Sequence, residues 1–378
     1  MKISIIIIFW SLWFLNFSTR TVLSPLLPII EDELSITHTL AGSIFLYISI
    51  GHTTTVFLSG LLSLKVGYKK LIIISFGILI AALILLKYGD TYLSFAAIAL
   101  FMGLGSGLYI PCAIPLLTSI IERSKWGKAI AFHETAASLC ILAIPLLTAV
   151  ALGYIHWRNL FIILGGFCLI ATTFFWLFVP DNRSMEKNTF RYGAILSRKD
   201  FWIITILMTV AAMATAGLYN IMPLFLVKEK GLELQTANSI FGFSRIGGFL
   251  VTIVIGIFLD RYRVRSIFFV ILLTTALSTI GIVFVQKFWF LMTILIIQGT
   301  SSIAAFPVGF VAISKLTDLS ERSAYTGTST SFAVIFGMGL TPLLLGAVAD
   351  AANFQIGIFF LGVIVLFACL FIKDLREI

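Results

Sequence analysis

The sequence predicts an all-α membrane protein in which twelve transmembrane helices form two pseudo-symmetric six-helix bundles. Three observations predict this fold class. The composition is too apolar for a soluble domain. The apolar segments are continuous and about 20 residues long, which is the length that crosses a bilayer. Landmarks of the first half of the chain also recur in the second half.

The composition indicates that lipid is the solvent for most of the surface. Of 378 residues, 60% are hydrophobic and 11% are charged, and the mean hydropathy is +1.08. Soluble domains carry about 25% charged residues. Inside lipid the backbone must satisfy its own hydrogen bonds, which leaves helices or closed barrels. Because barrel strands alternate apolar and polar positions and these segments do not, the sequence predicts helices.

The repeated landmarks are small or rigid residues that recur at an offset of 196 residues. The positions of the first half and their counterparts are, in order, Gly51, Gly60, Gly103 and Pro111, then Gly247, Gly256, Gly299 and Pro307. The segment 60–67 is echoed by 256–263. A repeat of this length indicates a duplicated membrane unit, as in many transporters.

The spans follow from the continuous apolar segments, with boundaries uncertain by a few residues. They are expected at residues 4–26, 40–63, 70–88, 93–121, 128–152, 158–179, 201–227, 236–259, 265–286, 288–314, 325–349 and 353–372. The first segment has no small-residue cleavage site after it, so we expect a retained helix and not a removed signal peptide.

The longest polar stretch, residues 180–199, falls between spans six and seven. The chain is therefore expected to divide into an N-terminal bundle at 1–180, a cytoplasmic linker at 181–200 and a C-terminal bundle at 201–378.

The distribution of positive charge predicts the orientation. With the N-terminus inside, 19 of the 26 lysines and arginines lie on inner segments and five on outer segments. The positive-inside bias then predicts a multi-pass protein of the cytoplasmic membrane with both termini in the cytoplasm. This distribution also accounts for the net charge of +9, so no nucleic-acid partner is expected.

Two six-helix halves, a linker and an inner-loop motif after spans two and eight resemble the major facilitator superfamily. The motif of that family reads Gly-x-Leu-Ala-Asp-Arg-x-Gly-Arg-Lys. The first half keeps Gly60, Leu62, Lys65, Gly67 and Lys69, with Leu64 in place of the Asp, and the second half keeps Gly256, Asp260, Arg261 and Arg263. Other family-like positions are Pro25 to Pro28 with Glu33 and Leu34, and Trp157 and Arg158 with Phe161.

The resemblance implies the major facilitator fold and alternating access around a central cavity, lined mainly by spans one, four, seven and ten. It also implies that the loop motif is a conformational lock at the cytoplasmic ends of the helices, where an Asp can meet a helix N-terminus and a neighbouring Arg. The residues expected in this lock are Gly60, Lys65, Gly67, Gly256, Asp260 and Arg261.

Two arginines remain inside predicted spans, Arg20 in span one and Arg245 in span eight. A charge there costs several kcal/mol unless it has water or a partner. Arg20 could instead snorkel to headgroups or pair with the acids at 31–33, which lie beyond two prolines, and Arg245 could bind a carbonyl. Two guanidiniums from opposite halves in one cavity would suit a carboxylate or another planar oxyanion. Anion porters of the superfamily often carry such arginines, so the chain resembles that group.

Three residues are candidates for carrying protons. His52 lies in the middle of span two, and a histidine titrates near neutral pH. His133 and Glu134 enter span five near its cytoplasmic end. Alternatively, His52 is satisfied by a neighbour, and Glu134 favours the helix N-terminus or pairs with Arg123 or Lys128.

Polar residues on the spans that the family analogy places around the cavity are weaker candidates for substrate contacts. They are Tyr109, Tyr219, Asn220 and Gln298, with Asn16, Ser301 and Ser302. Each alone is more often a hydrogen bonder in helix packing.

No motif indicates catalysis, so the protein is not expected to be an enzyme. The four cysteines form no Cys-x-x-Cys pair and imply no metal site. There is no Walker loop, and the glycines at 103–107 lie inside span four with no strand before them. No cofactor is expected.

The sequence thus favours a secondary active transporter that acts as a monomer in lipid and moves a small anion, coupled to protons. The alternative is a proton-driven drug or metabolite exporter. Many such exporters carry an acid in span one and a glycine-rich motif in span five. Span one here has no acid, and span five keeps Pro145 but has no glycine before Gly153. A non-transporting receptor is disfavoured by the charged residues retained in the membrane.

Overall fold

The fold was examined in a computed structural model, which describes residues 2–181 and 195–375, apart from a few side chains. Within these ranges the chain is helical and contains no β-strand. Twelve helical segments are long and apolar enough to cross a membrane. They are Ser4–Leu34, His38–Val66, Tyr68–Lys87, Tyr92–Ile120, Arg123–Ala151, Asn159–Phe178, Lys199–Lys228, Leu234–Leu259, Val264–Phe284, Phe288–Leu316, Ala324–Ala351 and Phe354–Asp374. The predicted all-α class with twelve spans is confirmed.

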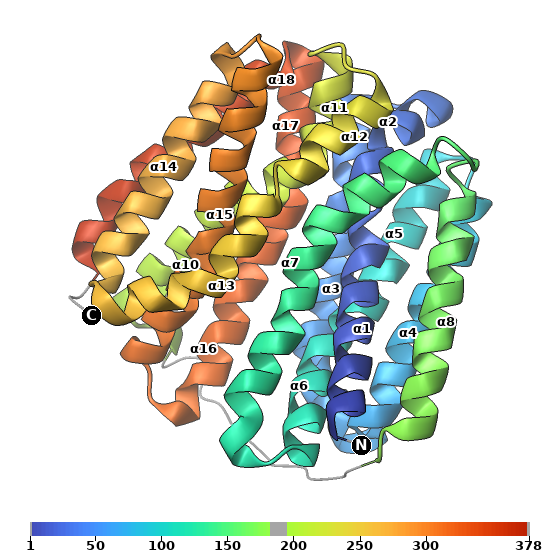
Figure 1. The fold of residues 1–378 in the computed structure, drawn as a ribbon, viewed down its shortest axis with the longest axis vertical. Helices are drawn as coiled ribbons and strands as arrows, with labels where there is room; N and C mark the ends of the chain where they lie inside the picture. Colours follow the sequence, from blue (N-terminus) through green and yellow to red (C-terminus); the bar gives the residue numbers. More distant parts are fainter. Residues whose placement is uncertain (1, 182–194, 376–378) are drawn as a thin grey trace. The chain divides into compact units, whose positions relative to one another are not determined.

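The described residues form two compact units. The first unit holds residues 2–36 and 44–181. Its elements are α1 (Lys2–Thr21), α2 (Leu23–Leu34), α3 (His38–Val66), α4 (Tyr68–Lys87), α5 (Tyr92–Gly107), α6 (Tyr109–Ile120), η1 (Arg123–Lys125), α7 (Trp126–Ala151) and α8 (Asn159–Phe178). Helix α1 packs against α7 and α8, and α4 packs against α5 and α8 (Figure 1).

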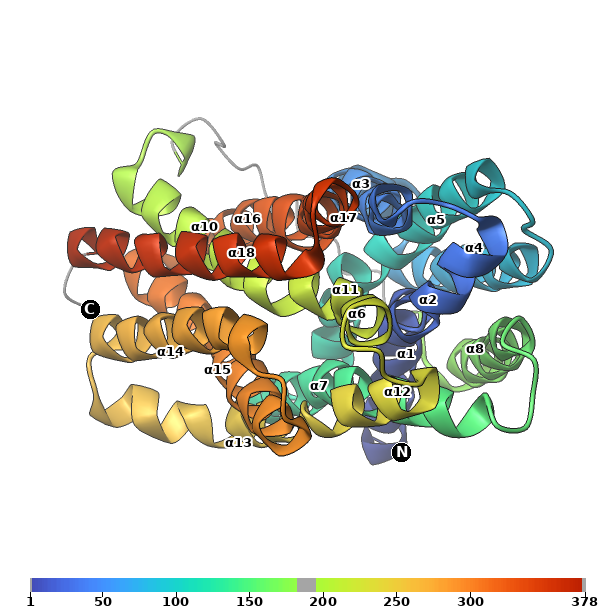
Figure 2. The same ribbon diagram turned by 90° about the horizontal axis from the view of Figure 1, so that it is seen from above.

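The second unit holds residues 37–43 and 195–375. Its elements are α10 (Lys199–Ala212), η2 (Met213–Gly217), α11 (Leu218–Lys228), α12 (Leu234–Phe243), α13 (Ile246–Arg261), α14 (Val264–Phe284), α15 (Phe288–Leu316), α16 (Leu319–Phe332), η3 (Ala333–Leu340), α17 (Thr341–Ala351), α18 (Phe354–Ala368) and η4 (Cys369–Asp374). Helix α14 packs against α15 and α18, which Figure 2 shows beside it.

Residues 37–43 belong with the second unit because Asp350 of α17 caps the start of α3. Its carboxylate accepts from the backbone N–H groups of His38 at 3.0 Å and Thr39 at 2.8 Å, and from the Thr39 hydroxyl. A carboxylate at a helix N-terminus satisfies N–H groups that have no partner within the helix.

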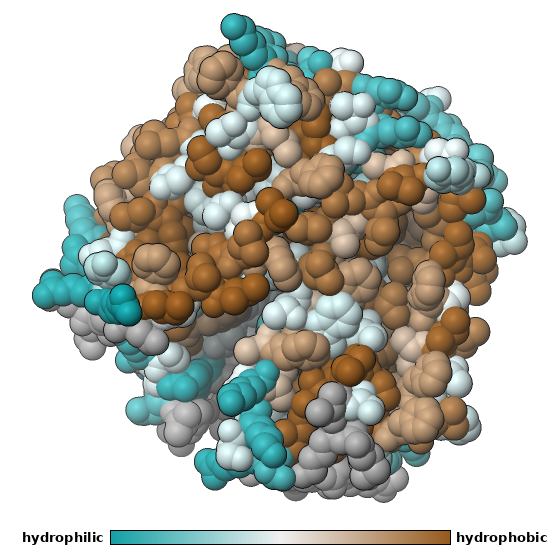
Figure 3. Space-filling model, in the orientation of Figure 1, coloured by the Kyte–Doolittle hydropathy of each residue, from teal (hydrophilic) through white to brown (hydrophobic). Residues whose placement is uncertain are grey.

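Apolar side chains face lipid in both units. Figure 3 shows brown, hydrophobic residues over the middle of the helices and teal, hydrophilic residues near their ends. Exposed examples from the two units include Phe167 and Trp176, and Ile253 and Phe360. An outer surface of this kind is stable only when lipid covers it, so the structure agrees with the composition.

Two predicted spans, the first and the fourth, are each divided into two helices shortly before a proline. Proline lacks an N–H and its ring clashes with the carbonyl four residues earlier. Helix α1 ends at Thr21, four residues before Pro25, and α5 ends at Gly107, four residues before Pro111. In the second unit, the segments η2 and η3 are π-helical, and α12 and α13 are separated at positions 244 and 245.

The repeated glycines allow the same helix pair to approach closely in each unit. A Cβ at Gly51 or Gly103 would collide with the backbone of the facing helix, at the carbonyl oxygens of Leu100 and Ile48 respectively. In the second unit, a Cβ at Gly247 would collide with the Thr300 side chain on α15. Small residues at helix contacts are the usual solution for close packing in membranes, which explains this part of the repeat.

The predicted linker at 181–200 falls mainly on residues 182–194, which lie outside the described residues. At its end, Arg198 binds Glu321 at 3.0 Å and the Leu316 carbonyl at 2.9 Å. The domain boundaries at 180 and 201 and the cytoplasmic termini stay predictions.

Candidate functional site

The first candidate site is the buried guanidinium of Arg20 near the end of α1. It lies 4.4 Å above the ring of Phe17 and 5.9 Å from that of Trp13. Its Nη1 is 3.4 Å from Nδ1 of His52 on α3, and its Nε has no hydrogen-bond partner. Among the described residues, no carboxylate lies within ion-pair distance. The charge is therefore held by aromatic faces and an imidazole.

The contacts of His52 depend on which ring nitrogen carries the proton. Its Nδ1 also lies 3.0 Å from Oγ of Ser106, and that hydroxyl donates to the Gly103 carbonyl at 3.0 Å. With the proton on Nε2, Nδ1 can accept from the guanidinium of Arg20, which can only donate. With the proton on Nδ1, the ring instead donates to Ser106, and Arg20 is only a close neighbour. Both neutral forms of His52 fit these distances.

The second candidate site surrounds Arg245, at the break between α12 and α13. The buried guanidinium lies 4.8 Å from the ring of Phe241 and 5.6 Å from that of Tyr219. Its Nη1 donates to Oε1 of Gln298 at 3.3 Å, and the amide of Gln298 donates to the Ala214 carbonyl in η2 at 2.8 Å. Among the described residues, no carboxylate approaches Arg245 within ion-pair distance either. Its Nε and Nη2 have no hydrogen-bond partner.

Other predicted polar residues of the second unit mainly join helices. Asn220 donates from Nδ2 to the Met338 carbonyl in the π-helical η3 at 3.1 Å. Ser301 accepts from the Thr275 hydroxyl at 3.0 Å, and the Ser302 carbonyl accepts from a threonine of η2. These contacts match the alternative of helix packing that the sequence left open.

Tyr109, His133 and Glu134 form a hydrogen-bonded chain in the first unit. The Tyr109 hydroxyl donates to the Phe9 carbonyl at 2.8 Å and lies 3.2 Å from Nε2 of His133. Nδ1 of His133 is 3.0 Å from Oε1 of Glu134. The rings of Trp13 and Tyr109 both stack on the imidazole, at 5.7 and 5.9 Å.

A proton count constrains this chain. Since a carbonyl cannot donate, the hydroxyl proton of Tyr109 points to Phe9, and Nε2 of His133 must donate to the Tyr109 oxygen. Nδ1 then faces a carboxyl oxygen, and that contact is a hydrogen bond only if one proton sits on the nitrogen or on the oxygen. While this hydrogen bond is intact, one exchangeable proton is shared between Nδ1 of His133 and the carboxyl group of Glu134.

Several sequence alternatives are decided by these contacts. Arg20 does not pair with Glu33, because Glu33 binds Arg158 at 2.7 Å and Trp157 at 2.8 Å. Glu134 pairs with His133, and neither Arg123 nor Lys128 lies within ion-pair distance of it. Asn16 is close to the first site, since its Nδ2 donates to the Ser106 carbonyl at 3.4 Å.

The loop-motif residues lie at the ends of α3 and α13. Gly67 has a φ of +88°, which favours glycine, whereas a Cβ at Gly60 or Gly256 would meet open space. Lys65 and Arg261 are exposed in the last turns of their helices. The side chain of Asp260 lies outside the described residues. The role of these residues as a conformational lock stays a prediction.

The sequence reading missed the aromatic faces that hold the two guanidiniums. Phe17 precedes Arg20 by three residues, and Phe241 precedes Arg245 by four. These are the spacings at which helical side chains meet. An aromatic residue at either spacing before a membrane arginine was therefore a usable signal.

The family model described as Major Facilitator Superfamily matches residues 9–284 and 234–377. Among curated relatives, "Probable sulfoacetate transporter SauU" of Cupriavidus necator is 22% identical over 275 residues, covering 68% of this chain and 64% of that protein. "Protein TsgA homolog" of Buchnera aphidicola is 21% identical, and the match covers 63% of this chain and 61% of that protein. The chain thus spans less than two thirds of the length of these relatives.

Solved structures share the fold over nearly the whole chain. A bacterial homolog to the human lysosomal transporter Spinster, in an inward-facing and unoccupied conformation, superposes with a TM-score of 0.83 at 13% identity and covers 98% of this chain and 96% of its own. The nucleoside transporter NupG superposes with a TM-score of 0.83 at 14% identity and covers 99% of this chain and 100% of its own. A D-xylose-proton symporter superposes with a TM-score of 0.83 at 14% identity and covers 99% of this chain and 98% of its own. At these identities the likeness concerns the fold alone.

Proposed function

The chain belongs to the Major Facilitator Superfamily and is a multi-pass secondary transporter, and from this premise we propose that it carries a small organic anion together with protons. One observation carries the proposal. Each unit holds a buried guanidinium that no carboxylate within the described ranges neutralises. A charge of this kind inside a membrane marks a substrate or ion pathway more often than a structural feature.

The open atoms of Arg245 suit a planar oxyanion. Nε and Nη2 form the edge of a guanidinium that presents two parallel N–H groups, and both lack partners. Carboxylates and sulfonates offer paired oxygens at the matching spacing. The printed name of the Cupriavidus necator relative, a sulfoacetate transporter, supports an anion that carries such groups.

Proton coupling is supported by the contact between Arg20 and His52. An imidazole with its proton on Nε2 accepts from the guanidinium at Nδ1. Protonation of His52 would release Arg20 and add a second positive charge beside it, so an anion and a proton would each favour binding of the other.

The His133 and Glu134 pair is a second candidate for the coupled proton. Its side chains hold one shared proton in the hydrogen-bonded state, and half of the Glu134 side chain (51%) is exposed. Exposure gives the pair a route for exchange that the buried imidazole lacks by itself. We propose further that the protein works as a monomer in the cell membrane with both termini in the cytoplasm.

The test is thermal shift of the purified full-length protein against acetate and sulfoacetate, with D-xylose as a neutral solute, at two pH values. Both anions should raise Tm, and more strongly at the lower pH. Arg20→Gln and Arg245→Gln should each weaken anion affinity by about tenfold to a hundredfold, the value of a charged hydrogen bond. The exposed Arg123 supplies the matched control, Arg123→Gln, which should bind as the wild type does.

Stabilisation by D-xylose alone, or anion binding that survives both substitutions, would overturn the anion assignment. The double variant Arg20→Gln/Arg245→Gln gives a second criterion. If one anion contacts both guanidiniums, the losses of binding free energy in the two single variants will not add up to the loss in the double variant. Full additivity would mean that each arginine acts by itself.

A further inference from the structure

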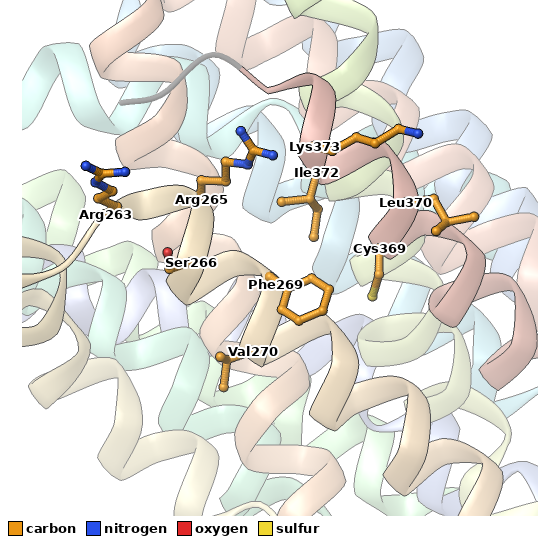
Figure 4. Close-up of a pocket in the computed structure, with 9 residues that line it drawn as sticks. All are labelled: Arg263, Arg265, Ser266, Phe269, Val270, Cys369, Leu370, Ile372 and Lys373. Atoms are coloured by element: carbon orange, nitrogen blue, oxygen red, sulfur yellow. The ribbon is translucent and has the colours of Figure 1, made fainter.

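A pocket outside both arginine sites lies between the start of α14 and η4, at the ends of two membrane-spanning segments. Its volume is about 500 Å³. The lining residues come from both elements and are shown in Figure 4. They are Arg263, Arg265, Ser266, Phe269, Val270, Cys369, Leu370, Ile372 and Lys373.

One end of this pocket is cationic. Arg263, Arg265 and Lys373 lie where the two spans end, and none of the lining residues is acidic. Arg263 is also the N-cap of α14 and offers no side-chain cap, so the helix adds the partial positive charge of its N-terminus. The acids nearest in sequence are Asp374, which is exposed and follows Lys373, and Asp260, whose side chain lies outside the described residues. The combined field selects an anion.

The other end is apolar and open on its flank. Phe269 and Val270 lie further along α14, one turn beyond the cations, and are 43% and 60% exposed. Leu370 on η4 is 60% exposed, whereas Ile372 is buried and forms part of the wall. These exposed side chains lie within predicted spans and therefore face acyl chains. A ligand that fits the whole pocket must be charged at the span ends and hydrocarbon deeper in.

We propose that this pocket binds an anionic glycerophospholipid, with its phosphate at Arg265 and Lys373 and an acyl chain along Phe269, Val270 and Leu370. Basic pockets between membrane helices favour such headgroups. A soluble phosphate would use the cations but would leave the apolar flank uncovered. The observations favour the lipid for this reason, and the proposal is independent of the transported solute.

The experiment uses the full-length protein in nanodiscs of phosphatidylcholine with a minor fraction of phosphatidylglycerol, released into detergent for native mass spectrometry. The wild type should retain phosphatidylglycerol in preference to phosphatidylcholine. The double variant Arg265→Gln/Lys373→Gln should retain about 25-fold less, since each cation near the surface contributes about fivefold. The matched control, Lys70→Gln/Lys315→Gln, removes two exposed lysines at other helix ends and should retain lipid as the wild type does.

Two further arms separate the lipid from a free phosphate and from misfolding. Phe269→Ser should weaken lipid retention, and soluble glycerol phosphate at millimolar concentration should not displace the lipid. Tm measured in detergent should be the same for both double variants. Equal retention in the two double variants, no preference between the two lipids, or displacement by glycerol phosphate would each overturn the proposal.

Discussion

Arg20 and Arg245 occupy similar surroundings but differ in the group that receives their hydrogen bond. Both are buried, both stack on a phenylalanine one helical turn earlier, at 4.4 and 4.8 Å, and neither meets a carboxylate among the described residues. Arg20 faces the imidazole of His52, which can take up a proton. Arg245 faces the amide of Gln298, which cannot.

This difference indicates a division of roles between the two units. The second unit holds its charge in a fixed frame, because Gln298 is itself tied to the Ala214 carbonyl. In the first unit the partner, His52, has a ring nitrogen that can either accept a hydrogen bond or bind a proton. We expect affinity for an anion to depend on pH through the first unit and to depend on geometry in the second.

The largest effect is expected from His52→Gln, which makes the first site resemble the second. The amide oxygen can still accept from Arg20, but it does not titrate. In the wild type, uptake of one proton with each anion makes affinity rise as pH falls, by at most about tenfold per pH unit. The variant should lose this slope. Isothermal titration with sulfoacetate at several pH values measures it.

The control is His156→Gln, at an exposed histidine of the loop between α7 and α8, which should keep the wild-type slope. If the slope survived in His52→Gln and vanished in Glu134→Gln, the result would contradict the assignment of the pH dependence to the partner of Arg20. The coupled proton would then belong to His133 and Glu134.

A smaller effect is expected from the repeated glycines. Gly103→Ala places a methyl group against the backbone of α3 and should destabilise the protein by about 1–3 kcal/mol. Gly299→Ala meets the Arg245 side chain and the Ser244 carbonyl at 3.0 Å. Since that side chain can shift, we expect a smaller loss of stability there, together with weaker anion binding.

Tm in detergent and sulfoacetate affinity, measured on the same samples, separate the two glycines. Gly166→Ala is the control, because a Cβ there meets nothing within 4 Å and alanine is the better helix former by about 0.5–1 kcal/mol. A lower Tm for Gly299→Ala than for Gly103→Ala would contradict the reasoning.

The smallest effect is expected from the aromatic faces. Phe17→Leu and Phe241→Leu keep apolar volume and remove the ring beneath the guanidinium. A cation–π contact of about 0.5–1 kcal/mol corresponds to about a twofold to fivefold loss of anion affinity. Equal losses in the two variants would confirm that the units hold their charge in the same way. Phe174→Leu, on an exposed ring that stacks on Phe178, should leave affinity unchanged. A loss in only one of the two test variants would contradict the likeness.

The fold was largely predictable from the sequence because a membrane allows few solutions for apolar segments of spanning length. The proline positions also predict the breaks after Thr21 and Gly107. The site was less predictable. Arg20 and Arg245 were visible as charges in apolar segments, but the contact with His52 joins residues that lie 32 positions apart. A packing register of that kind depends on close approach of three helices, which sequence spacing does not encode.

The aromatic support of the two guanidiniums has an electrical consequence. Because no acid within the described ranges compensates them, the two sites carry net positive charge among the membrane-spanning helices, and the monoanion of the proposed function would cancel part of it. Membrane voltage acts on charge at about 2.3 kcal/mol per elementary charge for each 100 mV. If the protein carries an anion as proposed, its loaded and empty forms will therefore respond differently to the resting potential of a cell.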